Sequence, residues 1–319
     1  MNTRKLALMV IFALAIKFWV FKPYVVTSNS MNSTLKQGDY LIVNKWENSI
    51  LGNHVKLKKD DVIAFHYPLD KGDIADKLVY IKRCVGVPGD TIIVRNGKVN
   101  SAEQSLQFDY IIDDPNSIIN WALLNKIDVH QGGKTVNNNW ILSLSDQQIK
   151  SLKNIDNEFV FQKLTQDINQ FDLSTFPSDT LKKWNQDFYG PIYIPKSGHT
   201  IKINRENISL YRKIIEVYEN HTIEVDNSNI VIDNTIAKSY TFEQNYYFMM
   251  GDNRHHSKDS RHWGFVPEDH IIASCAIVIF NIENPINPVQ LISYEVPGTG
   301  AGVHDMWVKN DTAFLNNGG

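Results

Sequence analysis

The sequence has few cysteines, little excess charge and a single long apolar run. Cys84 and Cys275 are its only cysteines; they are too few for a disulfide scaffold or a thiolate metal cluster, and we favour two buried free thiols. The formal net charge is -3 over 319 residues, and no basic stripe stands out, so nucleic acid is not expected as a partner. A hydrophobic content of 43% with 21% charged residues is typical of a folded protein rather than a disordered one.

The long apolar run lies at the N-terminus, from Leu6 to Phe21, and only Lys17 interrupts it. It is somewhat shorter than the roughly 20 residues that span a bilayer. Arg4 and Lys5 precede it, and positive charge tends to stay in the cytoplasm, so the chain after the run is expected outside. A cleaved signal peptide is the alternative. Because no small-x-small cleavage site follows the apolar core, we expect an uncleaved transmembrane anchor over residues 1–24.

Short apolar runs separated by glycine, proline and asparagine turns follow the anchor. Asn96-Gly97 between two such runs is a strong signal for a β-hairpin. Strands of this length and spacing favour a mainly β, antiparallel domain. The predicted strands include Tyr40–Val43, Val62–Phe65, Thr91–Val94, Tyr246–Met250 and Ile271–Phe280.

Between these two sets of strands, residues 101–240 have a mixed α+β character. Helices are predicted over 145–153, 159–169 and 208–218, with short strands around 190–203, 223 and 230. We assign this stretch no chemistry. The C-terminal tail, residues 283–319, resembles a fragment of one β-propeller repeat, which cannot bury its faces without neighbouring repeats.

Three polar blocks interrupt this pattern: Ser28-Asn29-Ser30-Met31, a strand-like run that carries Lys82, and a loop that begins at Gly251-Asp252-Asn253-Arg254. A serine hydroxyl is a poor nucleophile until a nearby base takes its proton. A lysine is such a base near neutral pH only if its pKa falls by about 3 units from its reference value. Burial against apolar neighbours lowers a lysine pKa in this way.

These blocks, in this order behind a membrane segment, resemble the bacterial type I signal peptidases, which cut signal peptides from exported preproteins with a serine–lysine dyad. The resemblance covers roughly residues 5–100 and 241–280. This chain departs from the family where Thr27 and Ser33 replace prolines and Asn29 replaces glycine, which predicts a looser nucleophile loop. The matched positions of the serine motif are Ser28, Ser30, Met31, Thr34 and Leu35.

The resemblance implies a role for each matched residue. Ser30 would be the nucleophile and Lys82 its general base. Ser28 would add its hydroxyl to an oxyanion hole beside the Ser30 backbone N–H, and Ser257 would hydrogen-bond and orient Lys82. The other matched residues are Asp252, Arg254, Asp259 and Arg261, which would form a supporting ion-pair network, and Val26 and Ile81, which would line shallow substrate pockets.

The resemblance also implies the partners and the architecture. The substrates would be secretory preproteins with small residues at positions -3 and -1, bound in extended form as an added strand, and the anchor would lie in a lipid bilayer. The catalytic domain would act on the outer face of the cytoplasmic membrane. No cofactor and no metal ion are expected. The catalytic β core would comprise residues 25–100 and 241–282, separated by the insertion 101–240.

Three alternatives remain open. A serine–histidine–aspartate triad lacks support, because no histidine lies in a recognisable motif; this includes His255 and His256. A self-cleaving repressor-type protease shares the serine–lysine chemistry, but such proteins are soluble and carry a DNA-binding helical domain. A catalytically inactive, membrane-tethered β protein that serves binding or assembly would tolerate loss of Ser30 and Lys82 without any change in processing.

Overall fold

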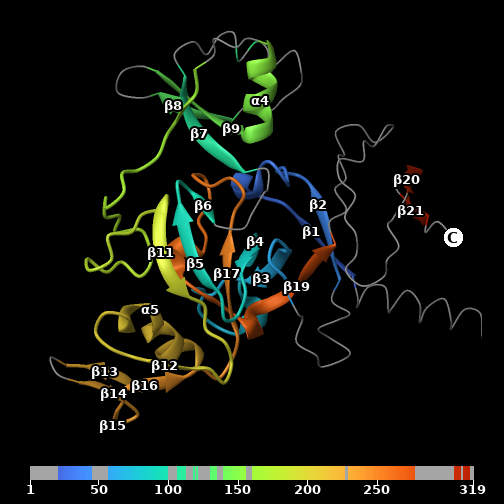
Figure 1. Ribbon diagram of the computed structural model, residues 1–319. Coiled ribbons are helices and arrows are strands. Elements are labelled where there is room, and N and C mark those ends of the chain that lie inside the picture. Colours follow the sequence, from blue (N-terminus) through green and yellow to red (C-terminus); the bar gives the residue numbers. More distant parts are fainter. Residues whose placement is uncertain are drawn as a thin grey trace, which may run out of the picture. The chain divides into compact units, whose positions relative to one another are not determined.

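The computed structural model describes residues 21–44, 57–99, 106–112, 118, 120, 130–134, 139–155, 160–226, 229–276, 305–309 and 312–316. In these ranges the chain is mainly β, with antiparallel strand pairs and short helices (Figure 1), which confirms the predicted class. The expected anchor lies almost entirely outside the described ranges, and its last residues are part of a strand rather than a helix. None of the described helices has the length and apolar character needed to cross a membrane.

The described chain forms two compact units. In the first, β1 (Phe21–Val25) pairs with β2 (Tyr40–Asn44), β2 with β19 (Ile271–Ala276), and β19 with β3 (Val62–His66), all antiparallel. Four successive side chains of β3 are buried, so this strand lies inside its unit. A short 3-10 turn, η2 (Ile74–Asp76), follows it.

The predicted tail is described only as a hairpin of the first unit, β20 (Asp305–Lys309) with β21 (Thr312–Asn316). Two antiparallel strands are compatible with part of a propeller blade, but many other folds contain such a hairpin. The propeller-like origin of the tail therefore stays a prediction. Both cysteines are buried free thiols, as expected.

In the second unit, β4 (Val79–Gly86, of which 82–86 belong here) pairs with β17 (Tyr246–Met250), and β17 with β18 (Val266–Pro267). β5 (Thr91–Arg95) forms a hairpin with β6 (Lys98–Val99). Asn96 and Gly97 turn this hairpin with φ of 52° and 73°, because the two-residue turn that matches strand twist needs positive φ at both positions. The predicted Asn-Gly hairpin is confirmed.

The predicted insertion contributes a further sheet and several short elements to the second unit. β7 (Gln107–Ile112) pairs with β9 (Trp140–Ser145), which is followed directly by α4 (Asp146–Ile155) (Figure 1). The predicted helix at 145–153 is thus confirmed, and so is the one at 208–218. The other elements are β8 (His130–Lys134), β10 (Gln162–Lys163), β11 (Phe188–Tyr193), β12 (Thr200–Lys202), α5 (Ile208–Lys213), the π-helical turn η3 (Ile214–Tyr218), β13 (Ile223–Val225), β14 (Ile230–Ile232), β15 (Thr235–Ile236) and β16 (Ser239–Thr241).

The helix predicted over 159–169 is wrong. Val160, Leu164 and Ile168 have helical spacing, yet their side chains are 69%, 37% and 65% exposed. Gln162–Lys163 instead forms β10, which pairs with Ile111 and Tyr110 of β7. An amphipathic pattern favours a helix only when its apolar face is buried, and here pairing with a distant strand overrides the local pattern.

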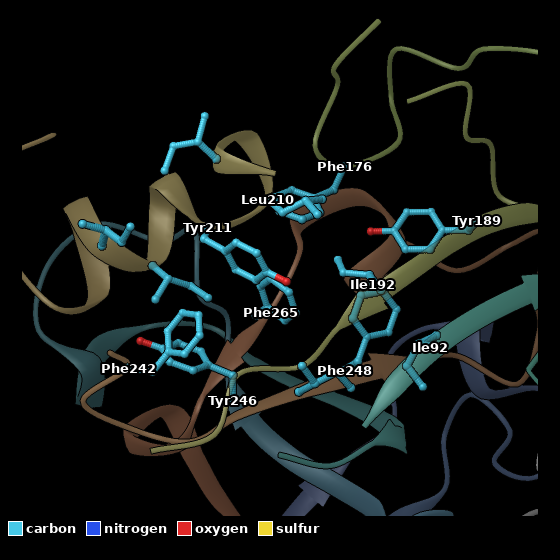
Figure 2. Packing of buried hydrophobic residues seen from close by; sticks show 14 of the residues in the cluster. Ile92, Phe176, Tyr189, Ile192, Leu210, Tyr211, Phe242, Tyr246, Phe248 and Phe265 are labelled. Atoms are coloured by element: carbon cyan, nitrogen blue, oxygen red, sulfur yellow. The ribbon is translucent and has the colours of Figure 1, made fainter. Parts of the chain in front are cut away.

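Aromatic side chains form much of the core of the second unit. Phe248 of β17 lies edge-on to Phe265, and Tyr211 of α5 stacks on the same ring at 6.0 Å between centroids (Figure 2). All five side chains of β17 are buried. Because β17 leads directly into the loop that begins at Gly251, this core fixes where that loop starts.

Candidate active site

Ser30 and Lys82 meet in the second unit, although 52 positions separate them in the sequence. Ser30 lies in a 3-10 turn, η1 (Asn29–Met31), and Lys82 lies on β4. Their side chains are hydrogen-bonded, Lys82 Nζ donating to Ser30 Oγ. The two residues are only 7% and 3% exposed, so bulk water has little access to this contact.

The surroundings of Lys82 favour its neutral form. Burial lowers the pKa of Lys82 to about 8, although the charges of Asp259 and Asp252 oppose this fall. Desolvation disfavours a charged amine, and nearby carboxylates favour it. Here desolvation dominates, and an appreciable fraction of Lys82 is a free amine near neutral pH.

The loop from Gly251 to Gly264 is hydrogen-bonded to the turn that bears Ser30. The Asn253 backbone N–H donates to the Ser30 carbonyl at 3.0 Å. At its far end the loop forms a short helix, α6 (Ser260–Trp263), whose first turn is capped by the Asp259 carboxylate. Gly251 N–H donates to that same carboxylate at 3.1 Å, which closes the loop on itself.

Gly251 has no room for a side chain. A Cβ there would lie 2.2 Å from Ser257 Oγ and 2.4 Å from the Ser30 carbonyl oxygen. The second clash is with backbone, which cannot move aside as a flexible side chain does. The Gly251 backbone therefore lies directly against the Ser30 peptide, a contact that sequence reasoning missed.

Gly251→Ala is expected to reduce peptide cleavage by about 100-fold, since displacing a reacting group by about 1 Å costs on that order. The measurement is kcat on a peptide or preprotein substrate, with folding checked by thermal unfolding. Gly86→Ala is the matched control, because a Cβ there meets the side-chain ends of Ile194 and Ile92 instead. The control should lose stability but retain kcat; equal kcat in the two variants would contradict the expectation.

Of the four predicted ion-pair residues, two pair with each other and a third pairs with a residue outside the set. Arg261 binds Asp259 through two N–H groups, at 2.9 and 2.7 Å. Asp252 pairs with Arg83 of β4, at 2.8 and 2.5 Å. Each is a bidentate, buried pair, the geometry in which arginine binds carboxylates most strongly. The side chain of Arg83 leaves β4 on the opposite side from Lys82, as neighbouring residues of a strand do.

Arg254 differs from the other charged residues of the loop. Its side chain is fully buried and Nη1 donates to the Gly97 carbonyl at 2.9 Å, while Nε and Nη2 have no hydrogen-bond partner among the residues that the structure describes. Burial lowers its pKa to about 10, although the charges of Asp252 and Asp259 oppose this fall. The place of Arg254 in a supporting network of charges therefore stays a prediction.

The predicted hydrogen bond from Ser257 to Lys82 is not formed. Ser257 Oγ is buried and has no hydrogen-bond partner among the residues that the structure describes. In the nucleophile turn, Ser33 adopts a φ of 89°, a value that proline cannot adopt. The loop at this position therefore has a conformation that a proline-containing loop cannot share.

Three predicted site residues belong to the first unit. Ser28 is exposed, Val26 is buried and Ile81 is half-buried. Their roles in the oxyanion hole and in the substrate pockets stay predictions. The same holds for the expected absence of a metal ion: no group of three or more metal-binding side chains occurs within the described ranges.

The chain matches the family described as "Signal peptidase, peptidase S26" over residues 2–153 and 191–280. The chain belongs to this family. Similar proteins include signal peptidase I of Buchnera aphidicola subsp. Schizaphis graminum, 25% identical over 284 residues, or 85% of this chain and 72% of that protein. Signal peptidase I of Aquifex aeolicus is 21% identical and covers 91% of both chains. The probable signal peptidase I-1 of Synechocystis sp. is 35% identical over 118 residues, 36% of this chain and 57% of that protein.

Membership of this family makes the chain a peptidase, and the family match extends into the predicted insertion. Most of residues 101–240 lie within the family match, and only residues 154–190 of this region lie outside it. The resemblance recognised from the three polar blocks left most of this stretch outside it. The bounds of the insertion, residues 101–240, stay a prediction.

Proposed function

We propose that this chain is a serine endopeptidase that removes signal peptides from exported preproteins, with Ser30 as nucleophile and Lys82 as general base. The observation that carries the proposal is the hydrogen bond between the buried Lys82 amine and the Ser30 hydroxyl. A pKa of about 8 for Lys82 supports a base that works near neutral pH, since a general base is most efficient when its pKa is close to the working pH.

In the first half of the reaction, neutral Lys82 takes the proton of the Ser30 hydroxyl as Ser30 Oγ attacks the scissile carbonyl carbon. The tetrahedral intermediate collapses as the Lys82 ammonium donates that proton to the leaving amine. The signal peptide is then esterified to Ser30. In the second half, Lys82 takes a proton from water, hydroxide attacks the ester, and Ser30 regains its proton as the signal peptide leaves.

The oxyanion of each intermediate requires preorganised donors, and donors of this kind are worth several kcal/mol in the transition state. We assign this role to the Ser30 backbone N–H and the Ser28 hydroxyl. The bond from Asn253 N–H to the Ser30 carbonyl supports the first assignment, because it fixes the orientation of the turn that bears Ser30. Ser257 Oγ is buried and has no hydrogen-bond partner within the described ranges, so it is suited to accept a hydrogen bond from Lys82 once that amine is protonated.

Substrate and membrane follow from the same proposal. The preprotein would bind in extended form near Val26 and Ile81, which accept small residues at -3 and -1, and residues 1–24 would hold the chain in the cytoplasmic membrane with the catalytic units outside. The names of the similar proteins support signal peptides as substrates. A catalytically inactive binding module is not favoured, because both residues of the dyad are present and in contact.

The test is incubation of the detergent-purified full chain with a preprotein, alongside Ser30→Ala. The wild-type chain should release the mature protein with a new N-terminus after the small residue at -1, and Ser30→Ala should release none above the uncatalysed rate. Mass spectrometry of the products identifies the cleaved bond. Cleavage by Ser30→Ala at the wild-type rate would refute the assignment of the nucleophile.

A further inference from the structure

Two consecutive histidines of the Gly251 loop reach carboxylates on other segments. His256 Nε2 lies 3.0 Å from Asp109 Oδ1, and His255 Nε2 lies 3.0 Å from Asp187 Oδ1. A carboxylate accepts hydrogen bonds only, so the Nε2 atom of each histidine is the donor. Burial raises the pKa of each aspartate, but the hydrogen bonds from these histidines and other donors prevail and hold both below their usual values.

The tautomer of His255 follows from its two partners. The backbone N–H of Asp109 donates to His255 Nδ1 at 3.1 Å, so Nδ1 carries no proton and the ring proton lies on Nε2, facing Asp187. The neutral ring thus accepts a hydrogen bond from one segment and donates one to another. Its Cβ belongs to the catalytic loop, so His255 joins three parts of the chain.

On one side the histidines reach strand β7, which is already paired with the loop. Gln107 N–H donates to the Asp252 carbonyl at 2.9 Å, and Arg254 N–H donates to the Gln107 carbonyl at 3.0 Å. Asp109, two residues along the same strand, also accepts a hydrogen bond from Ser143 of the adjacent strand β9. Backbone and side-chain contacts thus hold the loop to one strand.

On the other side His255 reaches residues 160–187, most of the stretch that the family match omits. Asn185 is fully buried and accepts the backbone N–H groups of Asp187 and Phe188 at 3.0 and 2.9 Å. The second carboxylate oxygen of Asp187 accepts the Gln166 N–H at 2.9 Å. Asp187 is therefore held firmly before it meets His255.

Residues 160–187 touch the catalytic loop at further points. Arg261 Nη1 donates to the Gln186 carbonyl at 3.1 Å, and Phe176 N–H donates to the Arg261 carbonyl at 2.7 Å. The Phe176 ring packs edge-on to Phe265 (Figure 2). Arg261 also lowers the pKa of Asp187 through its charge. Lys163 and Lys98 lie over the Phe108 ring, which packs edge-on to His255.

We propose that His255 and His256 are positioning residues that clamp the catalytic loop between strand β7 and residues 160–187. The clamped loop carries Asn253, which holds the Ser30 carbonyl, and the two aspartates whose charges act on Lys82. Releasing the clamp moves Ser30 and admits water to Lys82. The inference rests on the proposed function, since Ser30 and Lys82 are the groups that it positions.

The kinetic test compares His256→Ala with His256→Gln, whose side-chain amide also donates to Asp109, and with the double variant His255→Ala/His256→Ala. The matched control is His221→Ala, because His221 likewise contacts two carboxylates, at 2.6 and 3.1 Å, but on the exposed surface near β13. kcat and KM on a preprotein are measured from about pH 6 to about pH 10. This range covers the rise in activity that is expected as Lys82 loses its proton.

The clamp predicts a fall in kcat of about tenfold for His256→Ala and more for the double variant, with KM within about twofold, because misplaced reacting groups slow the chemical step. The pH at which activity rises should also increase by about half a unit, because hydration of Lys82 favours its charged form. His256→Gln should recover most of both effects, and His221→Ala should show neither. A purely structural role would lower the melting temperature but leave the pH at which activity rises unchanged.

Amide hydrogen exchange tests the clamp without substrate. The amides of Asn253 and Arg254, which donate to Ser30 and Gln107, should exchange faster in His256→Ala and in the double variant, but not in His221→Ala. An inactive wild-type chain would count against the proposed function alone, since the exchange result still decides on the clamp. The clamp would be overturned if amide exchange were unchanged in these variants. It would also be overturned if the double variant kept a normal kcat and the same pH of rising activity as the wild type.

Discussion

Lys82→Met is expected to abolish preprotein cleavage and to stabilise the fold. The buried amine is the proposed base, and methionine fills a similar volume without titrating. Burial lowers the pKa of Lys82 from 10.5 to about 8, a cost of roughly 3 kcal/mol at 1.36 kcal/mol per pKa unit. Removing the amine regains this energy less about 1 kcal/mol for its lost hydrogen bond to Ser30. We therefore expect a net gain of about 2 kcal/mol in the free energy of unfolding.

The pH dependence of this gain is specific. Below about pH 8 Lys82 is protonated in both states, so the folded wild-type chain bears the full cost of a buried charge. Above that pH the folded state releases its proton while the unfolded state keeps it, and stability rises with pH wherever the unfolded state binds more protons. The advantage of Lys82→Met should therefore be largest below about pH 8 and be lost before the pH reaches 10.5, where an ordinary lysine of the unfolded chain titrates.

Activity should also depend on the protonation state of Lys82, because cleavage requires its free amine. Wild-type kcat/KM should rise as pH passes through about 8, because only the free amine accepts the Ser30 proton. Lys82→Arg should be as inactive as Lys82→Met, since a guanidinium stays protonated at any working pH. The measurements are denaturant unfolding and preprotein cleavage across this pH range. A folded Lys82→Arg chain with near wild-type activity would rule out the dyad.

The contact between Ser30 and Lys82 was predictable because both residues lie in short blocks whose residue types match a known chemistry. The partners of the charged residues were less so. Arg83 meets Asp252 because β4 pairs with β17 and places Arg83 opposite Met250, a register that no local pattern reveals. The contact between Gly251 and the Ser30 peptide is also set by tertiary structure, so spacing along the chain gave no sign of it.

The strands with clear turn signals were predicted well, and the region around residue 160 was not. Asn96-Gly97 specifies a hairpin locally, since both residues adopt the positive φ that the turn needs. Residues 159–169 have helical apolar spacing, but β7 pairs with Gln162–Lys163 and the apolar side chains stay exposed. His255 and His256 were judged unremarkable because their carboxylate partners, Asp109 and Asp187, are more than 60 residues away.

Asp259→Asn is expected to be the most destabilising of the conservative changes in the loop. Asp259 and Arg261 are fully buried, and the carboxylate accepts two hydrogen bonds from that guanidinium and one from Gly251 N–H. Removing one charge of such a pair leaves the other buried without compensation, which costs about 3–5 kcal/mol. The matched control is Asp146→Asn, because Asp146 pairs with Lys98 at the surface, where both side chains are about half exposed, and such pairs contribute about 0–1 kcal/mol.

The pH dependence of the Asp259 variant separates the pair from simple packing. Burial raises the pKa of Asp259, but Arg261 outweighs this and holds it below the usual value of 3.8. The pair therefore stabilises the wild-type fold fully above about pH 4 and loses its effect as pH falls further, so the difference between wild type and Asp259→Asn should narrow in acid. The Asp259 charge also raises the pKa of Lys82. In a folded Asp259→Asn variant, activity should therefore rise at a pH below 8. Thermal unfolding and cleavage measured from acid to alkaline pH test both effects. A variant that is as stable as Asp146→Asn, and whose activity rises at the same pH as that of the wild type, would show that the buried pair supports neither the fold nor the base.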